Sequence, residues 1–153
     1  MSLQPKDPNF EERVKKTFAN QAAMTSFGVV LESVKPGHVI FTMPFKKEYT
    51  QQHGFTHGGV MGAVLDSACG FAAFSLMPAD AEVLTVEFKV NFLNPARGER
   101  FMFEGNVVKA GRTVTVAESK VFGVTGEEKK RIATMTGTLM SVYGRGDIKQ
   151  PNG

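Results

Sequence analysis

The sequence predicts an α+β fold, in which a twisted antiparallel sheet of about six strands wraps one long apolar helix, with a further helix at the N-terminus. Residues 57–77 are apolar almost all round and end before Pro78, which predicts a helix of about five or six turns with no polar face. Residues 84–92 alternate between apolar and polar side chains, as in a strand with one apolar face. Three β-rich runs follow at 100–109, 113–124 and 129–143, and the short turns between them predict antiparallel hairpins.

The first 56 residues add one helix and one hairpin. Residues 7–24 predict a helix, because Asp7 can cap its start and Glu11 and Glu12 favour that end. Its apolar stripe consists of Phe10, Val14, Phe18 and Met24. Residues 27–34 and 38–44 are β-rich and flank a Pro-Gly turn, so we expect a hairpin, followed by a polar loop over 46–56.

Length and composition favour one domain of an ordinary globular protein. The chain of 153 residues is predicted to be a single domain, with its core over 25–143 and a flexible tail at 144–153. The net charge of +3 is too small to predict a nucleic-acid partner, yet it suits a small molecule that carries phosphates. No membrane span and no apolar signal core are predicted. The single cysteine, Cys69, excludes an intrachain disulfide and favours a cytoplasmic location.

One face of the long helix carries its only charge, Asp66. At about 100° per residue, small side chains lie within roughly 60° of Asp66 on a helical wheel. These residues are Gly59, Gly62, Ala63, Cys69, Gly70 and Ala73. Another backbone or a ligand could therefore approach the carboxylate closely. A glycine face packed under a sheet, with Asp66 bonded to a core hydroxyl, is the alternative.

Two glycines open this helix. The N–H groups of Gly58 and Gly59 would lie in the first turn, where backbone donors lack acceptors within the helix. Together with the helix dipole these donors favour a negative oxygen, and glycine lets a substrate carbonyl come close. An ordinary glycine-rich turn is the alternative.

These residues carry a resemblance to a known family. His57-Gly58-Gly59, then Asp66, then Ala-Cys-Gly-Phe-Ala at 68–72 resembles the signature of hotdog-fold thioesterases, of the PaaI-like and thioesterase-superfamily-member-2 type. Residues 91–96 and 109–113 are similar to that family's strand end and hairpin turn, and the similarity covers about 51–142.

The resemblance implies hydrolysis of acyl-CoA thioesters without a metal or an organic cofactor. Asp66 matches the family's nucleophile or general base, and Gly58 matches the glycine whose N–H polarises the thioester carbonyl. His57 matches a histidine of secondary role, and Thr85 stands where a hydroxyl orients water. Gln51 stands where the family often has asparagine, so its geometry differs.

Substrate binding is expected at the glycine pair and at the hairpin turn after residue 108. The candidate residues are Gly59, Lys109, Gly111, Arg112 and Thr113, and the basic ones could contact CoA phosphates or simply be solvated. Cys69 is expected to pack in the core, because no feature supplies a base for it. The three histidines, His38, His53 and His57, lack the spacing of a zinc site, and the first two are expected in loops or turns.

The distance between the candidate residues requires a second chain in a catalytic site. Gly58 and Asp66 are eight residues apart, or about 12 Å along a helix, so one thioester carbonyl cannot contact both on the same helix. A catalytic interpretation therefore needs at least a homodimer, and the resemblance suggests a tetramer. A non-catalytic acyl-CoA binding or sensing protein of the same fold is the alternative function, and a dehydratase, which would need a differently placed histidine, comes last.

Overall fold

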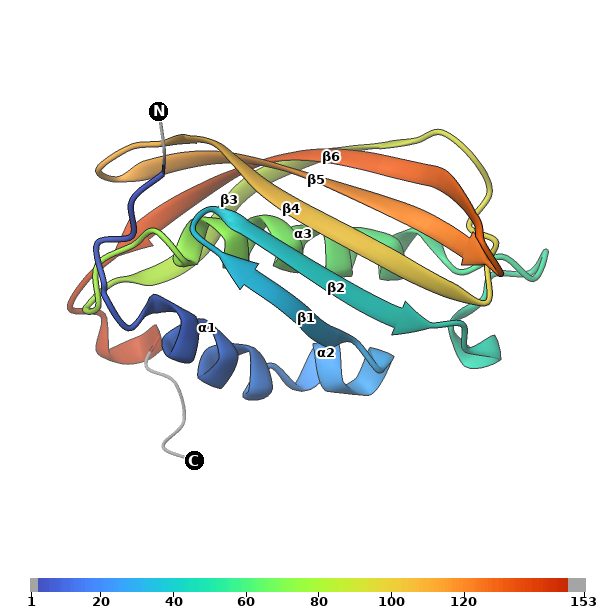
Figure 1. Cartoon of the computed structure of the whole chain (residues 1–153), viewed down its shortest axis with the longest axis horizontal. Coiled ribbons are helices and arrows are strands. Elements are labelled where there is room, and N and C mark those ends of the chain that lie inside the picture. The colour runs from blue at the N-terminus through green and yellow to red at the C-terminus, as the bar shows by residue number, and fades with distance from the viewer. Residues whose placement is uncertain (1–2, 149–153) are drawn as a thin grey trace.

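The computed structural model describes residues 3–148 and has the predicted architecture of a sheet curved around one helix (Figure 1). The helices are α1 (Phe10–Ala19), α2 (Ala22–Phe27) and α3 (Gly58–Phe74), and short 3₁₀ turns span Lys47–Tyr49 and Gly146–Ile148. The strands are β1 (Val30–Lys35), β2 (His38–Pro44), β3 (Glu82–Phe92), β4 (Arg100–Ala110), β5 (Val114–Thr125) and β6 (Glu128–Val142). The predicted strands therefore all form, with ends that shift by a few residues.

All six strands pair antiparallel in the order β1-β2-β4-β5-β6-β3. Three hairpins, β1–β2, β4–β5 and β5–β6, follow the turns that the sequence predicted. The strand that comes after α3, β3, pairs only with β6, so β3 is an edge of the sheet next to the helix. Its position matters for the site, because one side of β3 carries no further strand among the described residues.

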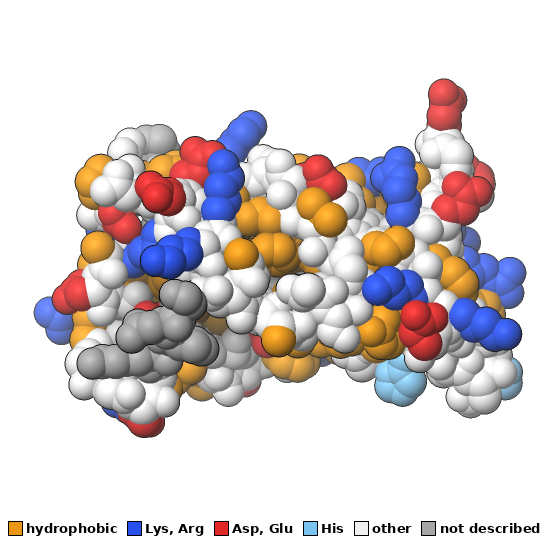
Figure 2. Space-filling model, turned by 90° about the horizontal axis from the view of Figure 1, so that it is seen from below, with side chains coloured by type: hydrophobic (Ala, Val, Ile, Leu, Met, Phe, Trp, Pro, Cys, Tyr) orange, Lys and Arg blue, Asp and Glu red, His pale blue; other side chains and the backbone are white. Residues whose placement is uncertain are grey.

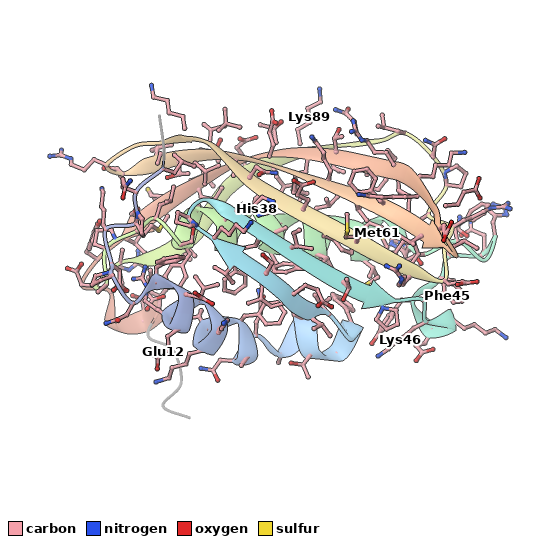
Figure 3. The ribbon with its side chains drawn as sticks, in the orientation of Figure 1. Glu12, His38, Phe45, Lys46, Met61 and Lys89 are labelled. Carbon is pink, nitrogen blue, oxygen red and sulfur yellow. The ribbon has the colours of Figure 1, made fainter. Side chains whose placement is uncertain are left out.

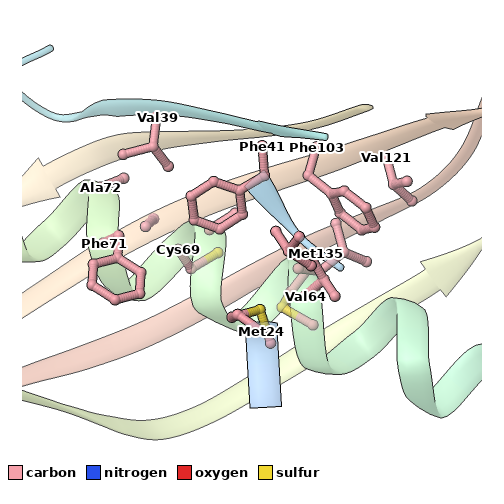
Figure 4. Close-up of a cluster of buried hydrophobic side chains, with 14 of the residues drawn as sticks. Met24, Val39, Phe41, Val64, Cys69, Phe71, Ala72, Phe103, Val121 and Met135 are labelled. Carbon is pink, nitrogen blue, oxygen red and sulfur yellow. The ribbon is translucent and has the colours of Figure 1, made fainter. Parts of the chain in front are cut away.

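The core lies between α3 and the concave face of the sheet (Figure 4). Phe41 of β2, Phe103 of β4 and Leu65 of α3 are fully buried there. Helix and sheet approach closely at Gly105, where a Cβ atom would lie 2.3 Å from the carbonyl oxygen of Ala68. Only glycine allows this approach, because any side chain would overlap the helix backbone. In Figure 3 Met61 is directed between α3 and the sheet, whereas Lys89 points outward.

The predicted helix over 7–24 was wrong as a single element. It divides into α1 and α2, because Gln21 leaves the helical conformation (φ −83°, ψ 92°) as the N-cap of α2. Asp7 does not cap the helix; α1 begins after Asn9. The Asp7 carboxylate instead accepts the backbone N–H of Asn9 and forms an ion pair with Arg13, so tertiary contacts override the expected cap.

Two further expectations need correction. The helix α3 is not buried on all sides, since Gly59, Ala63, Asp66 and Gly70 all keep some exposure, while Cys69 and Ala73 are fully buried. The small residues predicted to lie beside Asp66 are therefore partly exposed at the surface and partly packed in the core. His38 does not lie in a loop: it begins β2 and its Nε2 lies 3.2 Å from the carboxylate of Glu104.

The face that carries α1 and α2 shows hydrophobic side chains between charged ones (Figure 2). Within residues 3–148, none of the helices combines the length and the apolar character needed to cross a membrane. The predicted flexible tail falls partly outside the described residues, which end at position 148 with the second 3₁₀ turn.

Candidate active site

Asp66 lies in the middle of α3, on the side that faces the edge strand β3. The hydroxyl of Thr85 in β3 donates a hydrogen bond of 2.8 Å to the Asp66 carboxylate. Burial raises the pKa of the Asp66 carboxyl above its usual range, and the bond from Thr85 partly offsets this rise. A carboxylate whose pKa is raised is a stronger base once it is ionised.

The Asp66 carboxylate opens into a cavity of about 290 Å³, between α3, β3 and the junction of α1 and α2. We call it the acyl cavity, and its lining residues are Thr17, Asn20, Gln21, Asp66, Ser67, Gly70, Phe71, Glu82, Val83 and Thr85. A Cβ atom on Gly70 would meet no other atom within 4 Å, so the helix leaves free space beside the carboxylate. The hydroxyl that binds Asp66 thus belongs to an exposed edge strand and not to the core, unlike the alternative considered for the sequence.

The N-terminus of α3 forms a second polar site. His57 is the N-cap, and its Nδ1 accepts the backbone N–H of Gly59 at 2.8 Å. In the neutral ring this leaves the proton on Nε2, so the free edge of His57 is a donor. Gly59 thereby uses its N–H inside the protein, whereas the N–H of Gly58 precedes the first acceptor of the helix.

Gly58 lines a separate cavity of about 400 Å³, which we call the glycine cavity. Its walls also include Gln51, Thr56, Phe92 and Asn94. The side-chain oxygen of Gln51 accepts the backbone N–H of His53, which ties the loop into a tight turn and leaves the amide nitrogen for other partners. Gln51 therefore accompanies Gly58 and does not line the cavity of Asp66 in the same chain.

The predicted site residues fall into three places along α3. Asp66 and Thr85 meet in the acyl cavity, while Gly58 and Gln51 meet at the glycine cavity. The hairpin turn lies at the opposite end of the helix, where Gly111 and Arg112 line a third cavity beside Met77. Lys109 and Thr113 are exposed in the same region. One chain therefore keeps the expected catalytic and binding groups apart.

Cys69 is an inert core residue in this structure. Its side chain is fully buried, and its Sγ lies 3.3 Å from the hydroxyl of Ser119. Burial raises the pKa of its thiol to about 11, so a thiolate is disfavoured near neutral pH. In the part of the chain that the structure describes, no three His, Cys, Asp or Glu side chains gather in a way that could hold a metal ion.

Eight of the ten residues that line the acyl cavity, all but Asp66 and Thr85, were not predicted as site residues, and two of the eight contact each other. Gln21 and Ser67 come from elements predicted as uninterrupted helix, and the Ser67 hydroxyl donates to the Gln21 side-chain oxygen at 3.3 Å. Gln21 is a good helix former, so its propensity gives no sign of the break at this position. Asn20, the C-cap of α1 and a residue type common at helix ends, and Ser67, next to Asp66, were the available signals.

A family model described as the thioesterase superfamily matches residues 53–130. The chain belongs to the thioesterase superfamily. This matched segment contains Gly58, Asp66 and Thr85, while α1 and α2 lie outside it. A solved structure of a thioesterase family protein from Silicibacter pomeroyi is 52% identical, with a TM-score of 0.87, over 88% of this chain and 99% of that one. The PaaI protein of Escherichia coli, from the phenylacetic acid degradation operon, shares the fold at 18% identity, with a TM-score of 0.81 over 91% of this chain and 97% of that one.

Among curated relatives of this superfamily member, a protein of Saccharolobus solfataricus named as a candidate esterase is 36% identical over 56% of this chain. The medium/long-chain acyl-CoA thioesterase YigI of Escherichia coli is 31% identical over 55% of this chain. Each of these matches spans 61% of the relative's length. The predicted hotdog fold and the predicted thioesterase family are therefore both confirmed.

Proposed function

We propose that this member of the thioesterase superfamily hydrolyses acyl-CoA thioesters to a free acid and CoA. One observation carries the proposal: a partly buried carboxylate, Asp66, faces the acyl cavity and is oriented by the hydroxyl of Thr85. A protein that only binds acyl-CoA gains nothing from a negative charge beside the thioester. The name of the relative YigI supports acyl-CoA as the substrate class.

The chemistry can proceed with side-chain and backbone groups of the protein alone. Asp66 removes a proton from water, and the water oxygen attacks the thioester carbon; alternatively the Asp66 carboxylate attacks first and water then cleaves the mixed anhydride. In either route the N–H of Gly58 stabilises the oxyanion that forms. When water attacks directly, the carbon–sulfur bond then breaks. In the anhydride route this bond breaks earlier, as the Asp66 carboxylate displaces the CoA thiolate. In both routes the thiolate leaves and takes up a proton that comes from the water. No metal or organic cofactor is needed in this scheme.

Two chains would complete each site. Gly58 and Asp66 lie about 12 Å apart along α3, so we assign the oxyanion donor to a second subunit. The edge strand β3 offers a surface for that subunit, because it exposes large apolar side chains. These are Leu84, Val86, Phe88 and Phe92, with exposed fractions of 38%, 57%, 46% and 52%. A long apolar edge strand favours pairing with another copy.

The remaining assignments follow from this dimer. In this dimer, the turn with Lys109 and Arg112 holds CoA phosphates. Separately, the buried thiol of Cys69, the single cysteine, suits a cytoplasmic enzyme. His57 orients groups at the glycine cavity through its Nε2 donor. Pairing of dimers gives a homotetramer.

The test replaces Asp66 by asparagine, which keeps the shape of the side chain and removes its charge. We expect kcat on an acyl-CoA panel to fall by about 10²–10⁴, as for loss of a positioned base or nucleophile. Affinity for acyl-CoA should change little. The matched control is Asp80→Asn, which makes the same change in an exposed loop and should keep wild-type kcat.

Measuring the stability of Asp66→Asn distinguishes a loss of catalysis from misfolding. The raised pKa means that ionising Asp66 costs folding free energy once the pH exceeds the ordinary carboxyl range, so Asp66→Asn should be at least as stable as wild type at pH 7. Wild-type turnover by a folded Asp66→Asn protein would disprove the assignment. Tight acyl-CoA binding by the wild type, with no hydrolysis across the panel, would favour a binding or sensing protein instead.

A further inference from the structure

One wall of the acyl cavity is polar where an acyl-binding surface would ordinarily be apolar. It is formed at the junction of α1 and α2 by Asn20 and Gln21, and Ser67 of α3 extends it. Ser67 is only 8% exposed, and its hydroxyl donates to the side-chain oxygen of Gln21. This bond fixes the orientation of the Gln21 amide.

The bond leaves Gln21 with unused donors. Among residues 3–148 no protein acceptor pairs with the amide nitrogen of Gln21, whose side chain lines the cavity. An unbranched apolar acyl chain would cover these N–H groups without replacing their hydrogen bonds to water, and this loss opposes binding. An oxygen on the acyl chain could accept from them.

The charges of the cavity limit which oxygen this can be. The Asp66 carboxylate faces the cavity, and no Lys, Arg or His is among the described residues of the same chain that line it. A second carboxylate on the acyl group would be repelled by Asp66. The cavity volume of about 290 Å³ in one chain also lies just below the usual range for ligand pockets, about 300–1,000 Å³.

We propose that Gln21, held by Ser67, selects short acyl groups that carry a neutral oxygen, a hydroxyl or a ketone, over unsubstituted and dicarboxylic acyl groups. This inference rests on the proposed thioesterase function. Gln21 acts on specificity and not on the reaction, because it is separated from the thioester by the acyl chain. It lies in the N-terminal helices, outside the segment that the family model matches, residues 53–130.

The experiment compares kcat/KM on pairs of substrates of equal chain length. The probes are butanoyl-CoA, 3-hydroxybutanoyl-CoA and 4-hydroxybutanoyl-CoA, with succinyl-CoA as the anionic member. We expect one hydroxylated substrate to exceed butanoyl-CoA by about two- to tenfold, the value of one net hydrogen bond. Succinyl-CoA should be the poorest of the four.

Variants test whether Gln21 causes the preference. Gln21→Met keeps the length of the side chain and removes its donors, so the hydroxy-to-unsubstituted ratio should fall to one or below while turnover of butanoyl-CoA rises. Ser67→Ala should reduce the ratio part of the way. Gln52→Met, the same change in an exposed loop, should leave the ratio intact. A merely structural role for Gln21 would lower both rates together and leave the ratio unmoved.

The outcomes distinguish this inference from the function on which it rests. If the wild type prefers butanoyl-CoA or succinyl-CoA, or if Gln21→Met keeps the wild-type ratio, the specificity proposal is overturned and the thioesterase function stands. If no acyl-CoA is hydrolysed at all, both proposals fail.

Discussion

Arg13 of α1 ties the N-terminal helices to the end of α3, and its replacement by methionine tests how firmly they are held. The guanidinium donates to the carbonyl oxygens of Phe74, Met77 and Pro78 at the end of α3, and it stacks on the ring of Phe74 at 4.3 Å. Its Nε also lies 3.2 Å from the Asp7 carboxylate, an ion pair without hydrogen-bond geometry.

The expected loss follows from burial. The side chains of Arg13 and Asp7 are only 17% and 6% exposed. Removing Arg13 leaves the buried Asp7 carboxylate with the backbone N–H of Asn9 but without its ionic partner, and breaking such a pair costs about 3–5 kcal/mol of unfolding free energy. For a chain of this length each kcal/mol corresponds to about 2–4 °C in Tm, so Arg13→Met should lower Tm by about 6–20 °C.

Thermal unfolding followed by circular dichroism at pH 7 measures this loss. The matched control is Lys15→Met, on the same helix, which breaks the exposed Lys15–Glu11 pair (60% and 55% exposed) and should cost less than about 1 kcal/mol. The double variant Arg13→Met/Asp7→Asn should lose less than Arg13→Met alone, because it removes the stranded charge. If Arg13→Met has the same Tm as the Lys15→Met control, the contacts of Arg13 do not hold α1 in place.

Two further predictions concern the proposed reaction. kcat/KM should rise with pH as Asp66 loses its proton, and this acid limb of the pH profile should lie above the ordinary carboxyl range. Thr85→Val should move the limb to still higher pH, because it removes the hydrogen bond that lowers the pKa of Asp66. Thr85→Ser keeps the hydroxyl and should leave the limb in place. A limb that stays in place in Thr85→Val would exclude Asp66 as the titrating base. Gly58→Pro should keep the fold, since proline suits the first helical position and His57 is already extended there (φ −60°, ψ 135°). The exposed Phe92 ring, 3.1 Å from a Cβ atom at this position, must move slightly aside. The substitution should lower kcat by about 10²–10³ through loss of the N–H. Mixing the Gly58→Pro and Asp66→Asn proteins in equal amounts should restore about a quarter of wild-type activity if each site uses both chains. Half of the randomly formed dimers then hold both variants, and each of these has one intact site. No recovery on subunit exchange would refute the shared site.

The sequence predicted those parts of the fold that depend on local periodicity. The alternation over residues 84–92 is a property of neighbouring side chains, and so is the apolar character of α3, which explains why both elements appeared where expected. The break at Gln21 was not predictable in this way. It allows Phe18 of α1 to pack on Phe41 at 5.1 Å between ring centroids while Met24 of α2 is buried in the same core, and these contacts join distant parts of the chain.

The candidate site shows the same division. The side of α3 that carries Asp66 follows from helical geometry. The family resemblance predicted Thr85 as a hydroxyl that orients water, but it did not predict the hydrogen bond from Thr85 to Asp66. The partners of Arg13 lie more than 60 residues away along the chain, and no local pattern encodes them. The open side of α3 was also not foreseen, because it depends on β3 being the edge of the sheet.

This edge position connects assembly with chemistry. Asp66 faces an edge strand, so in a single chain the acyl cavity opens toward solvent beside exposed apolar side chains of β3. Burial is the principal cause of the raised pKa of Asp66, so a second subunit seated on β3 would shield the carboxylate further and raise that pKa again. The same contact would bring a Gly58 N–H to the thioester carbonyl. In the proposed dimer the step that supplies the oxyanion donor therefore also strengthens the base, and an isolated chain lacks both.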